Sequence, residues 1–347
     1  MSLVRFDAVS IVFGDRPEAA LPLMDAGQSR AEIQDATGQI LGVHDCSLDV
    51  AEGEILVLMG LSGSGKSTLL RAVNGLNPVV RGAVHVHDGQ SMRNVTEADA
   101  QTLRSLRLNQ IAMVFQQFGL LPWRSVRDNV GLGLELGGMP APEITARVDA
   151  QLSLVGLEAW ADRRVDELSG GMQQRVGLAR AFVTEAPILL MDEPFSALDP
   201  LIRNRLQDEL LELQARLKRT IIFVSHDLDE AFKIGNRIAI MEGGRIVQCG
   251  TPQEIIGVPA SEYVADFVAH MNPLSVLVAA DVMSPVDGAA AALGLPLPHD
   301  APLSDVMRTL VEQGPVTVTR NGKTIGRVTR DDVLTGLLRP RGGQPSA

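Results

Sequence analysis

Residues Gly60–Thr68 read GLSGSGKST, a glycine-rich loop from which the organisation of the surrounding chain can be worked out. The run Glu54–Met59 before it is typical of a buried parallel strand, and Ser67–Val73 after it has helical spacing. Strand, loop and helix in this order form the context that a phosphate-binding loop requires. The stretch therefore predicts an α/β fold with a nucleotide bound at the loop.

Each part of the loop has a task in holding phosphate groups. Gly60, Gly63 and Gly65 let backbone N–H groups face an anion without a Cβ in the way, and the helix dipole adds positive charge. Lys66 is expected to reach the β- and γ-phosphates of ATP, and Ser67 to bind Mg²⁺. The remaining predicted ATP contacts in the loop are Leu61, Ser62, Ser64 and Thr68.

Two more apolar runs, Pro187–Met191 and Thr220–Val224, are predicted to be strands of the same sheet. Asp192 and Glu193 follow the first run, and His226 follows the second. Ligands of open α/β sheets bind outside the carboxyl ends of the strands, so these side chains should converge on the loop. We expect Asp192 to hold Mg²⁺, directly or through water, and Glu193 to polarise the attacking water as a general base.

A second helix start lies at Leu168–Met172, which reads LSGGM and precedes apolar residues at near-helical spacing. Its backbone donors predict a second anion site, although one ATP needs only one such cradle within its own subunit. With the loop and the acidic pair, this stretch resembles the signature of the ATP-binding cassette (ABC) ATPases. Met172 stands where many members carry Gln, but that side chain is not the phosphate ligand.

The resemblance implies a homodimer that closes around two ATP molecules. Ser169, Gly170 and Gly171 would contact the ATP held by the opposing subunit. Asp199 would join them, because Ser196–Asp199 resembles the D-loop that crosses the dimer interface.

Three further residues match landmarks of the same family. Gln116 resembles the glutamine that touches Mg²⁺ and water and reports to the transmembrane partner, and His226 resembles the switch histidine that contacts the γ-phosphate. Phe13 stands where an aromatic ring normally stacks on adenine, although a core phenylalanine is the alternative.

A narrower resemblance rests on residues 16–42, a helix-prone insertion between the first strand and the next element. Such an insertion, together with VFQQFGLLP at 114–122 and PLIR at 200–203, is similar to the ATPases of glycine betaine/proline and choline importers. This implies import of choline, glycine betaine or proline betaine through an integral membrane permease, served indirectly by an external substrate-binding protein. The chain would then lie at the cytoplasmic face of the inner membrane as a peripheral subunit.

Composition fits these expectations. The 347 residues are enough for two domains, and the apolar runs fall far short of the ~20 residues that span a bilayer. With no N-terminal signal pattern either, the channel is expected to be a separate polypeptide. A net charge of −11 argues against nucleic acid as a partner. Cys46 and Cys249 lack ligand-like spacing, which suits a reducing compartment.

Two domains are expected along the chain. Residues 1–272 would form the ABC ATP-binding domain, with a RecA-like core, an antiparallel β layer and a helical subdomain at about 117–167. The helical part would form a groove for the permease. Leu120–Trp123 is either the lip of that groove or a buried apolar cluster.

Residues 273–347 would form a small α+β domain. Alternating β-branched residues around Asn321-Gly322 predict a hairpin between two helices, an order that resembles one cystathionine-β-synthase (CBS) motif. Thr329 and Asp332 match the Thr-x-x-Asp that contacts ribose in nucleotide-binding examples. Since these motifs normally work in pairs and only one fits here, a regulatory sensor and a dimerisation or packing appendage both remain open.

The sequence leaves three alternatives to quaternary-amine import. They are an importer ATPase for another small solute, a non-transport cassette that acts on ribosomes or DNA, and a nucleotide-sensing regulatory module. The complete set of Asp192, Glu193 and His226 favours an enzyme that turns ATP over.

Overall fold

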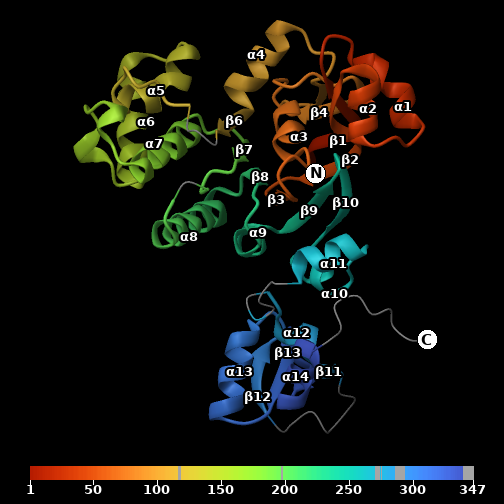
Figure 1. The fold of residues 1–347 in the computed structure, drawn as a ribbon. Coiled ribbons are helices and arrows are strands. Elements are labelled where there is room, and N and C mark those ends of the chain that lie inside the picture. The colour runs from red at the N-terminus through yellow and green to blue at the C-terminus, as the bar shows by residue number, and fades with distance from the viewer. Residues whose placement is uncertain (116–118, 197, 270–273, 275, 286–293, 339–347) are drawn as a thin grey trace. The chain divides into compact units, whose positions relative to one another are not determined.

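The computed structural model describes the chain except residues 116–118, 197, 270–273, 275, 286–293 and 339–347 (Figure 1). It divides into two compact units, Met1–His226 with Ala239–Ile246, and Asp227–Ile238 with Val247–Ala347. The boundary expected at residues 272–273 lies outside the described residues and stays a prediction.

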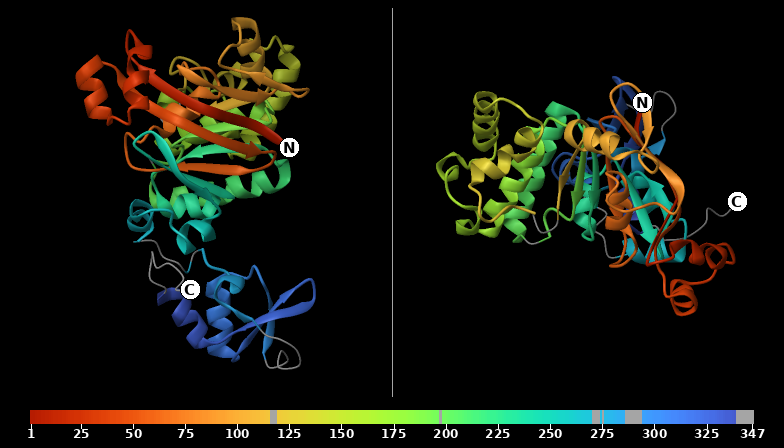
Figure 2. Two further views of the ribbon diagram at one scale, coloured as in Figure 1. Left: turned by 90° about the vertical axis from the view of Figure 1, so that its right-hand side faces the viewer. Right: turned by 90° about the horizontal axis from the view of Figure 1, so that it is seen from above.

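An antiparallel sheet contains the first strands. Its order is β2-β1-β4-β5, formed by β1 (Ser2–Phe13), β2 (Ile40–Ala51), β4 (Arg81–His87) and β5 (Met92–Asn94). The long strands β1 and β2 run side by side in Figure 2, and Phe13 pairs with Ile40 at their end. Buried and exposed residues largely alternate along β2, as expected for a sheet with only one face packed against the protein.

A second, six-stranded sheet has the order β10-β9-β3-β8-β7-β6. Its strands are β3 (Ile55–Met59), β6 (Ile111–Val114), β7 (Ile188–Asp192), β8 (Thr220–Val224), β9 (Arg237–Glu242) and β10 (Arg245–Gly250). Strands β3, β8, β7 and β6 pair in parallel, and every residue of β3, β7 and β8 is buried. The continuous apolar sequences of β3, β7 and β8 predict buried strands. The structure confirms these three strands, and their bounds agree with the predicted ones to within one residue.

Three helices of the same unit follow strands of the two sheets. They are α3 (Lys66–Ala72), α4 (Ala100–Asn109) and α8 (Pro200–Leu217). The second unit begins with α9 (Leu228–Ile234). The insertion at residues 16–42 forms a 3₁₀ turn at Pro17–Ala20, α1 (Leu21–Asp25) and α2 (Arg30–Thr37), which confirms its helical character.

A separate helical layer consists of α5 (Val126–Leu136), α6 (Ala141–Leu154) and α7 (Gly170–Val183), with 3₁₀ turns at Glu158–Trp160 and Val165–Glu167 (Figure 1). Its own apolar core includes Val130, Val148 and Val176, none of which is exposed. Leu120 packs against this core, whereas the Trp123 side chain is 68% exposed. The segment Leu120–Trp123 is therefore not a buried cluster as a whole.

The second unit continues with α10 (Pro252–Gly257) and α11 (Glu262–Val268) and ends in a small sheet of order β11-β14-β13-β12. Its elements are α12 (Ala279–Val282), β11 (Ser284–Pro285), β12 (Leu295–Pro298), α13 (Leu303–Glu312), β13 (Val316–Arg320), β14 (Lys323–Val328) and α14 (Arg330–Leu338). Asn321 and Gly322 have φ of 51° and 75°, as a type I′ turn requires, so the predicted hairpin is confirmed.

None of the helices in the described ranges combines the length and the apolar character that a bilayer crossing requires.

Asn129 on α5 holds the segment that precedes this helix. Its fully buried amide accepts from the Leu121 N–H at 2.7 Å and donates to the carbonyls of Leu121 and Ser125 at 3.0 and 2.9 Å. Asn129→Ala leaves the Leu121 N–H without this partner, while the carbonyls of Leu121 and Ser125 keep backbone donors. The substitution should destabilise the protein by about 1–3 kcal/mol. Thermal unfolding measures this change. Asn109→Ala, at an exposed position on α4, should shift the midpoint far less; equal shifts would contradict the assignment.

Candidate functional site

The glycine-rich loop joins β3 to α3 and follows a path that only glycine fits. Gly60 and Gly65 have φ of 142° and 102°. A Cβ on Gly60 would lie 2.2 Å from the Met241 carbonyl oxygen, and one on Gly65 would lie 2.6 Å from that of Gly42. Gly63, with φ of 78°, faces open space. The backbone is thus bare where an anion would approach.

The polar atoms of the loop fit a phosphate ligand. Leu61, Ser62 and Gly63 are exposed, and Thr68 is half-buried. Ser64 is buried, and its hydroxyl has no hydrogen-bond partner among the described residues. A buried hydroxyl without a partner inside a glycine cradle is suited to a bound anion.

Lys66 lies at the start of α3 with only 5% of its surface exposed. Its Nζ donates to the carbonyl oxygens of Gly60 at 2.8 Å and Leu61 at 3.0 Å, so the side chain folds back along the loop. Burial lowers the pKa of Lys66, while the negative charges of Glu193 and Asp192 act in the opposite direction. The two predicted carboxylates therefore lie close enough to Lys66 to affect its charge.

Asp192 is fully buried at the end of β7 and is bound on both carboxylate oxygens. Oδ1 accepts from the Ser67 hydroxyl at 2.6 Å, while Oδ2 accepts from Arg71 Nε and Nη2 at 3.1 and 2.8 Å. We had not predicted Arg71 from the sequence. Its position four residues after Ser67 places both side chains on one face of α3, and this spacing could have revealed it.

Glu193 and His226 also meet. Glu193 Oε2 lies 3.2 Å from His226 Nδ1, and the Glu193 side chain is 18% exposed against 57% for His226. Glu193 has φ of 47°, in the left-handed region that a non-glycine residue rarely adopts. Strands β7 and β8 pair in parallel, so their carboxyl ends bring these two residues together.

Gln116 and Phe13 are the two remaining predicted residues of the ATP site. Gln116 lies outside the described residues. Phe13 ends β1 and is 36% exposed. A Cβ on Gly42 would lie 2.9 Å from the Phe13 ring and 3.0 Å from the Thr68 methyl group, so the ring lies beside the first turn of α3.

The residues assigned to an opposing subunit lie elsewhere. Ser169 is the exposed N-cap of α7, and its side chain makes no capping hydrogen bond. A Cβ on Gly171 would lie 3.7 Å from both Leu198 and Ile202, so the start of α7 adjoins the start of α8. Asp199 caps α8 by accepting from the backbone N–H groups of residues 201 and 202, a structural role that the sequence analysis did not foresee.

In the second unit, beside the sheet β11-β14-β13-β12, Thr329 and Asp332 bind each other. Asp332 Oδ2 accepts from the Thr329 hydroxyl at 2.6 Å and its N–H at 2.8 Å, and Oδ1 accepts from the Ser284 hydroxyl at 2.7 Å. Burial alone would raise the pKa of Asp332, but the hydrogen bonds from Thr329 and Ser284 lower it. The pair closes the start of α14, so its side chains already have partners within this chain.

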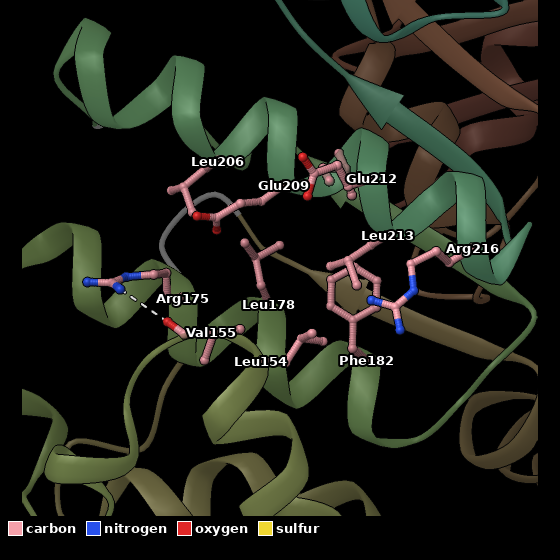
Figure 3. A pocket seen from close by; sticks show the side chains of 11 residues that line it. Leu154, Val155, Arg175, Leu178, Phe182, Leu206, Glu209, Glu212, Leu213 and Arg216 are labelled. Carbon is pink, nitrogen blue, oxygen red and sulfur yellow. Dashed lines mark hydrogen bonds between the residues drawn. The ribbon is translucent and has the colours of Figure 1, made fainter.

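A cavity of about 100 Å³ lies where α6, α7 and α8 meet (Figure 3). Leucines form much of its wall: Leu154, Leu178, Leu206, Leu210 and Leu213. Arg175 bridges α7 to the end of α6 by donating to the Val155 carbonyl at 3.1 Å. No predicted site residue in the described ranges lines this cavity.

Comparison with known proteins identifies this combination of loop, sheet and helical layer. The family model described as "ABC transporter" matches residues 43–196. The ATP-binding cassette MJ0796, solved as a dimer bound to ADP and Pi in a post-hydrolysis state, superposes with a TM-score of 0.61 at 29% identity. The match covers 72% of this chain and 98% of that one.

Curated relatives resemble the chain over most of its length. The glycine betaine/proline betaine transport system ATP-binding protein ProV of Escherichia coli (strain K12) is 46% identical over 341 residues, 95% of this chain and 82% of ProV. The glycine betaine transport ATP-binding protein OpuAA of Bacillus subtilis (strain 168) is 47% identical over 280 residues, 81% of this chain and 66% of OpuAA. The trimethylamine N-oxide transport system ATP-binding protein TmoW of Ruegeria pomeroyi is 44% identical over 330 residues, 94% of this chain and 95% of TmoW.

Lys66→Ala should weaken ATP binding by about 10- to 100-fold, because the variant loses charged hydrogen bonds to the phosphates. Titration with a fluorescent ATP analogue measures the affinity. Lys323→Ala removes an exposed lysine from β14 and is the matched control. Equal affinities in the two variants would refute the assignment of this loop.

The stability of the C-terminal core should depend on pH through Asp332. Because its pKa is lowered on folding, the contribution is present above the ordinary aspartate pKa and is lost as the pH falls toward the folded value. Asp332→Asn should cost about 1–2 kcal/mol at pH 7, because an amide accepts these hydrogen bonds more weakly than a carboxylate does, and it should flatten this dependence. Denaturant titrations followed by methyl signals of labelled Val316, Val318 and Val328 report on this core. An Asp331→Asn control that behaves like Asp332→Asn would contradict the assignment.

Proposed function

Because this chain belongs to the ABC transporter family, among the ATP-binding proteins of glycine betaine transport systems, we propose that it hydrolyses ATP to drive quaternary-amine import. The observation that carries the proposal is the convergence of Lys66, Asp192 and the Glu193–His226 pair at one sheet edge. The relatives' names favour a betaine as the imported solute and favour transport over action on ribosomes or DNA.

In this proposal the side chains divide the work of hydrolysis. Lys66 and the loop N–H groups hold the phosphates of ATP, and Glu193 takes a proton from the attacking water. His226 lies within hydrogen-bond reach of Glu193, which supports a role in orienting the carboxylate toward the attacking water. The contact of His226 with the γ-phosphate is assigned from the family motif. Gln116 is assigned to the same site from its place in the family motif.

The donor set also fits Mg²⁺, which would neutralise charge on the phosphates. Ser67 and Asp192 offer two oxygen ligands 2.6 Å apart, and Mg²⁺ prefers such ligands. Both atoms now bind each other, so on Mg²⁺ binding the Ser67 hydroxyl would keep its proton, turn it away from Asp192 and offer its lone pair to the ion. Arg71 would remain on the other carboxylate oxygen and keep Asp192 in place.

A second copy of the chain would complete each site. At the start of α7, Ser169 and Gly170 are exposed and Gly171 is half-buried, and Asp199 lies at the start of α8. Beside it the apolar side chains of Leu201 and Ile202 are 81% and 41% exposed, as expected of a surface that another subunit covers. The dimeric form of the similar cassette MJ0796 supports this arrangement.

The permease would bind between the helical layer and the sheet. A cavity of about 300 Å³ there is lined by residues that include Phe115, Gly119, Leu136 and Arg180. Arg180 donates to the Gly119 carbonyl at 2.7 Å, and burial lowers its pKa. Leu136 is 55% exposed, so an apolar surface is available to a segment of a membrane partner at the cytoplasmic face. The external binding protein would act through that partner.

For residues 273–347 we propose a CBS-like regulatory or dimerisation domain. The four-stranded sheet with α13 and α14 and the confirmed hairpin support the resemblance. Since Thr329 and Asp332 already satisfy each other, the packing role is better supported than direct nucleotide binding by this pair.

The test is ATP-dependent uptake of labelled glycine betaine, proline betaine and choline into vesicles that contain this protein, its permease and the external binding protein. Glu193→Gln should lower ATP hydrolysis and uptake by about 100-fold or more while ATP binding persists, because only the general base is lost. Glu52→Gln, at an exposed turn, is the matched control and should behave as the parent does.

The outcomes are distinct. Hydrolysis at the parental rate in Glu193→Gln would refute its role as the base. Intact ATPase activity without uptake of any of the three solutes would refute the proposed substrate class while leaving the ATP site in place.

A further inference from the structure

Arg30, the first residue of α2, contacts the phosphate loop from outside. One guanidinium nitrogen, Nη1, donates to the Gly63 carbonyl, and the other, Nη2, donates to the Gly42 carbonyl on β2. Arg30 belongs to the insertion at 16–42, none of whose residues takes part in the hydrolysis mechanism proposed above. The insertion leaves β1 after Phe13 and returns just before Gly42, so both of its ends lie beside the loop.

The helix that carries Arg30 is firmly attached. Ser29 and Glu32 form a capping box at its start, and Gly38 ends it with φ of 70°. Its one buried residue, Ile33, packs with Val12, Ala20, Met24 and Leu41, a core shared with β1 and β2. Arg30 is therefore held in place by a folded element rather than by a loose loop.

The guanidinium occupies a narrow space between glycines. A Cβ on Gly244 would lie 2.7 Å from Arg30 Nη2, and one on Gly65 would lie 3.6 Å from it. Its Nε is buried and has no partner in the part of the chain that the structure describes. Larger residues at Gly244 would displace the side chain, so the local sequence provides the space that Arg30 needs.

The contact restricts the peptide between Gly63 and Ser64. Gly63 has φ of 78° and open space where a Cβ would lie, so its peptide is held by hydrogen bonds rather than by packing against a side chain of its own. The carbonyl of a trans peptide points opposite to the following N–H, so holding the Gly63 oxygen also sets the direction of the Ser64 N–H. That N–H in turn donates to Leu61 at 3.1 Å, which closes the exposed turn.

We propose that Arg30 is a positioning residue of the phosphate loop, which holds the Gly63 carbonyl so that the loop is preformed before ATP binds. The helical insertion thereby contributes to nucleotide affinity without touching the reacting atoms. The inference rests on the proposed ATP site. Preorganisation of this kind lowers the ordering cost of binding and affects affinity more than the chemical step.

Arginine suits this position because its planar fork can donate to two carbonyls at once, whereas lysine offers a single flexible ammonium. Arg30→Gln should raise both the Kd and the KM for ATP by about tenfold, with kcat within about twofold of the parent, since one charged hydrogen bond to the loop is lost. Arg30→Lys should weaken ATP binding by about threefold. The rise in thermal midpoint on adding ATP should be smaller than in the parent.

The matched control is Arg16→Gln, which removes an exposed arginine from the same insertion and should leave ATP affinity at the parental value. Parental affinity in Arg30→Gln, or an equal loss in Arg16→Gln, would overturn the inference. If Arg30→Gln does not fold, parental affinity in Arg30→Lys would overturn it. Lys66→Ala separates the two proposals: if that variant loses ATP binding and the Arg30 variants do not, the ATP site stands and only the role of Arg30 fails.

Discussion

Ser67 donates a hydrogen bond to Asp192, and this contact holds the two halves of the nucleotide site together. Strand β8 lies between β3 and β7, so the glycine-rich loop and Asp192 leave the sheet two strands apart. Helix α3 packs on β8 and β7 and carries Ser67 across that separation. The arrangement of Lys66, Glu193 and His226 therefore depends on the parallel register of the three strands, since a shifted strand would move each group away from its partner.

Much of this region could be predicted because its sequence signals are local. Strands β3, β7 and β8 are continuous apolar runs buried on both faces, and the glycines before Lys66 allow one kind of backbone path. The strand bounds differ from the predicted ones by one residue, at Glu54, Pro187 and Asp192. Asp192 pairs with Val224 and so belongs to its strand, a fact that depends on the neighbouring strand and not on Asp192 itself.

The contacts that escaped prediction join segments far apart in sequence, or reuse a motif residue for packing. Arg30 lies 33 residues from Gly63, and no local pattern relates them. Asp199 and Asp332 are predicted ligand contacts, and in this chain both also bind backbone N–H groups, at the starts of α8 and α14. Carboxylates serve as helix caps and as ligands, and sequence alone does not separate these uses.

The left-handed backbone at Glu193 has a consequence for how this protein can change. A residue with a side chain is strained there, and glycine would relieve that strain. Selection for heat resistance alone would thus tend to replace the acid that the reaction needs. Glu193 is retained only while selection maintains ATP hydrolysis. A descendant of this chain that no longer hydrolyses ATP should therefore lose this glutamate early, and its folded state should become more stable as a result.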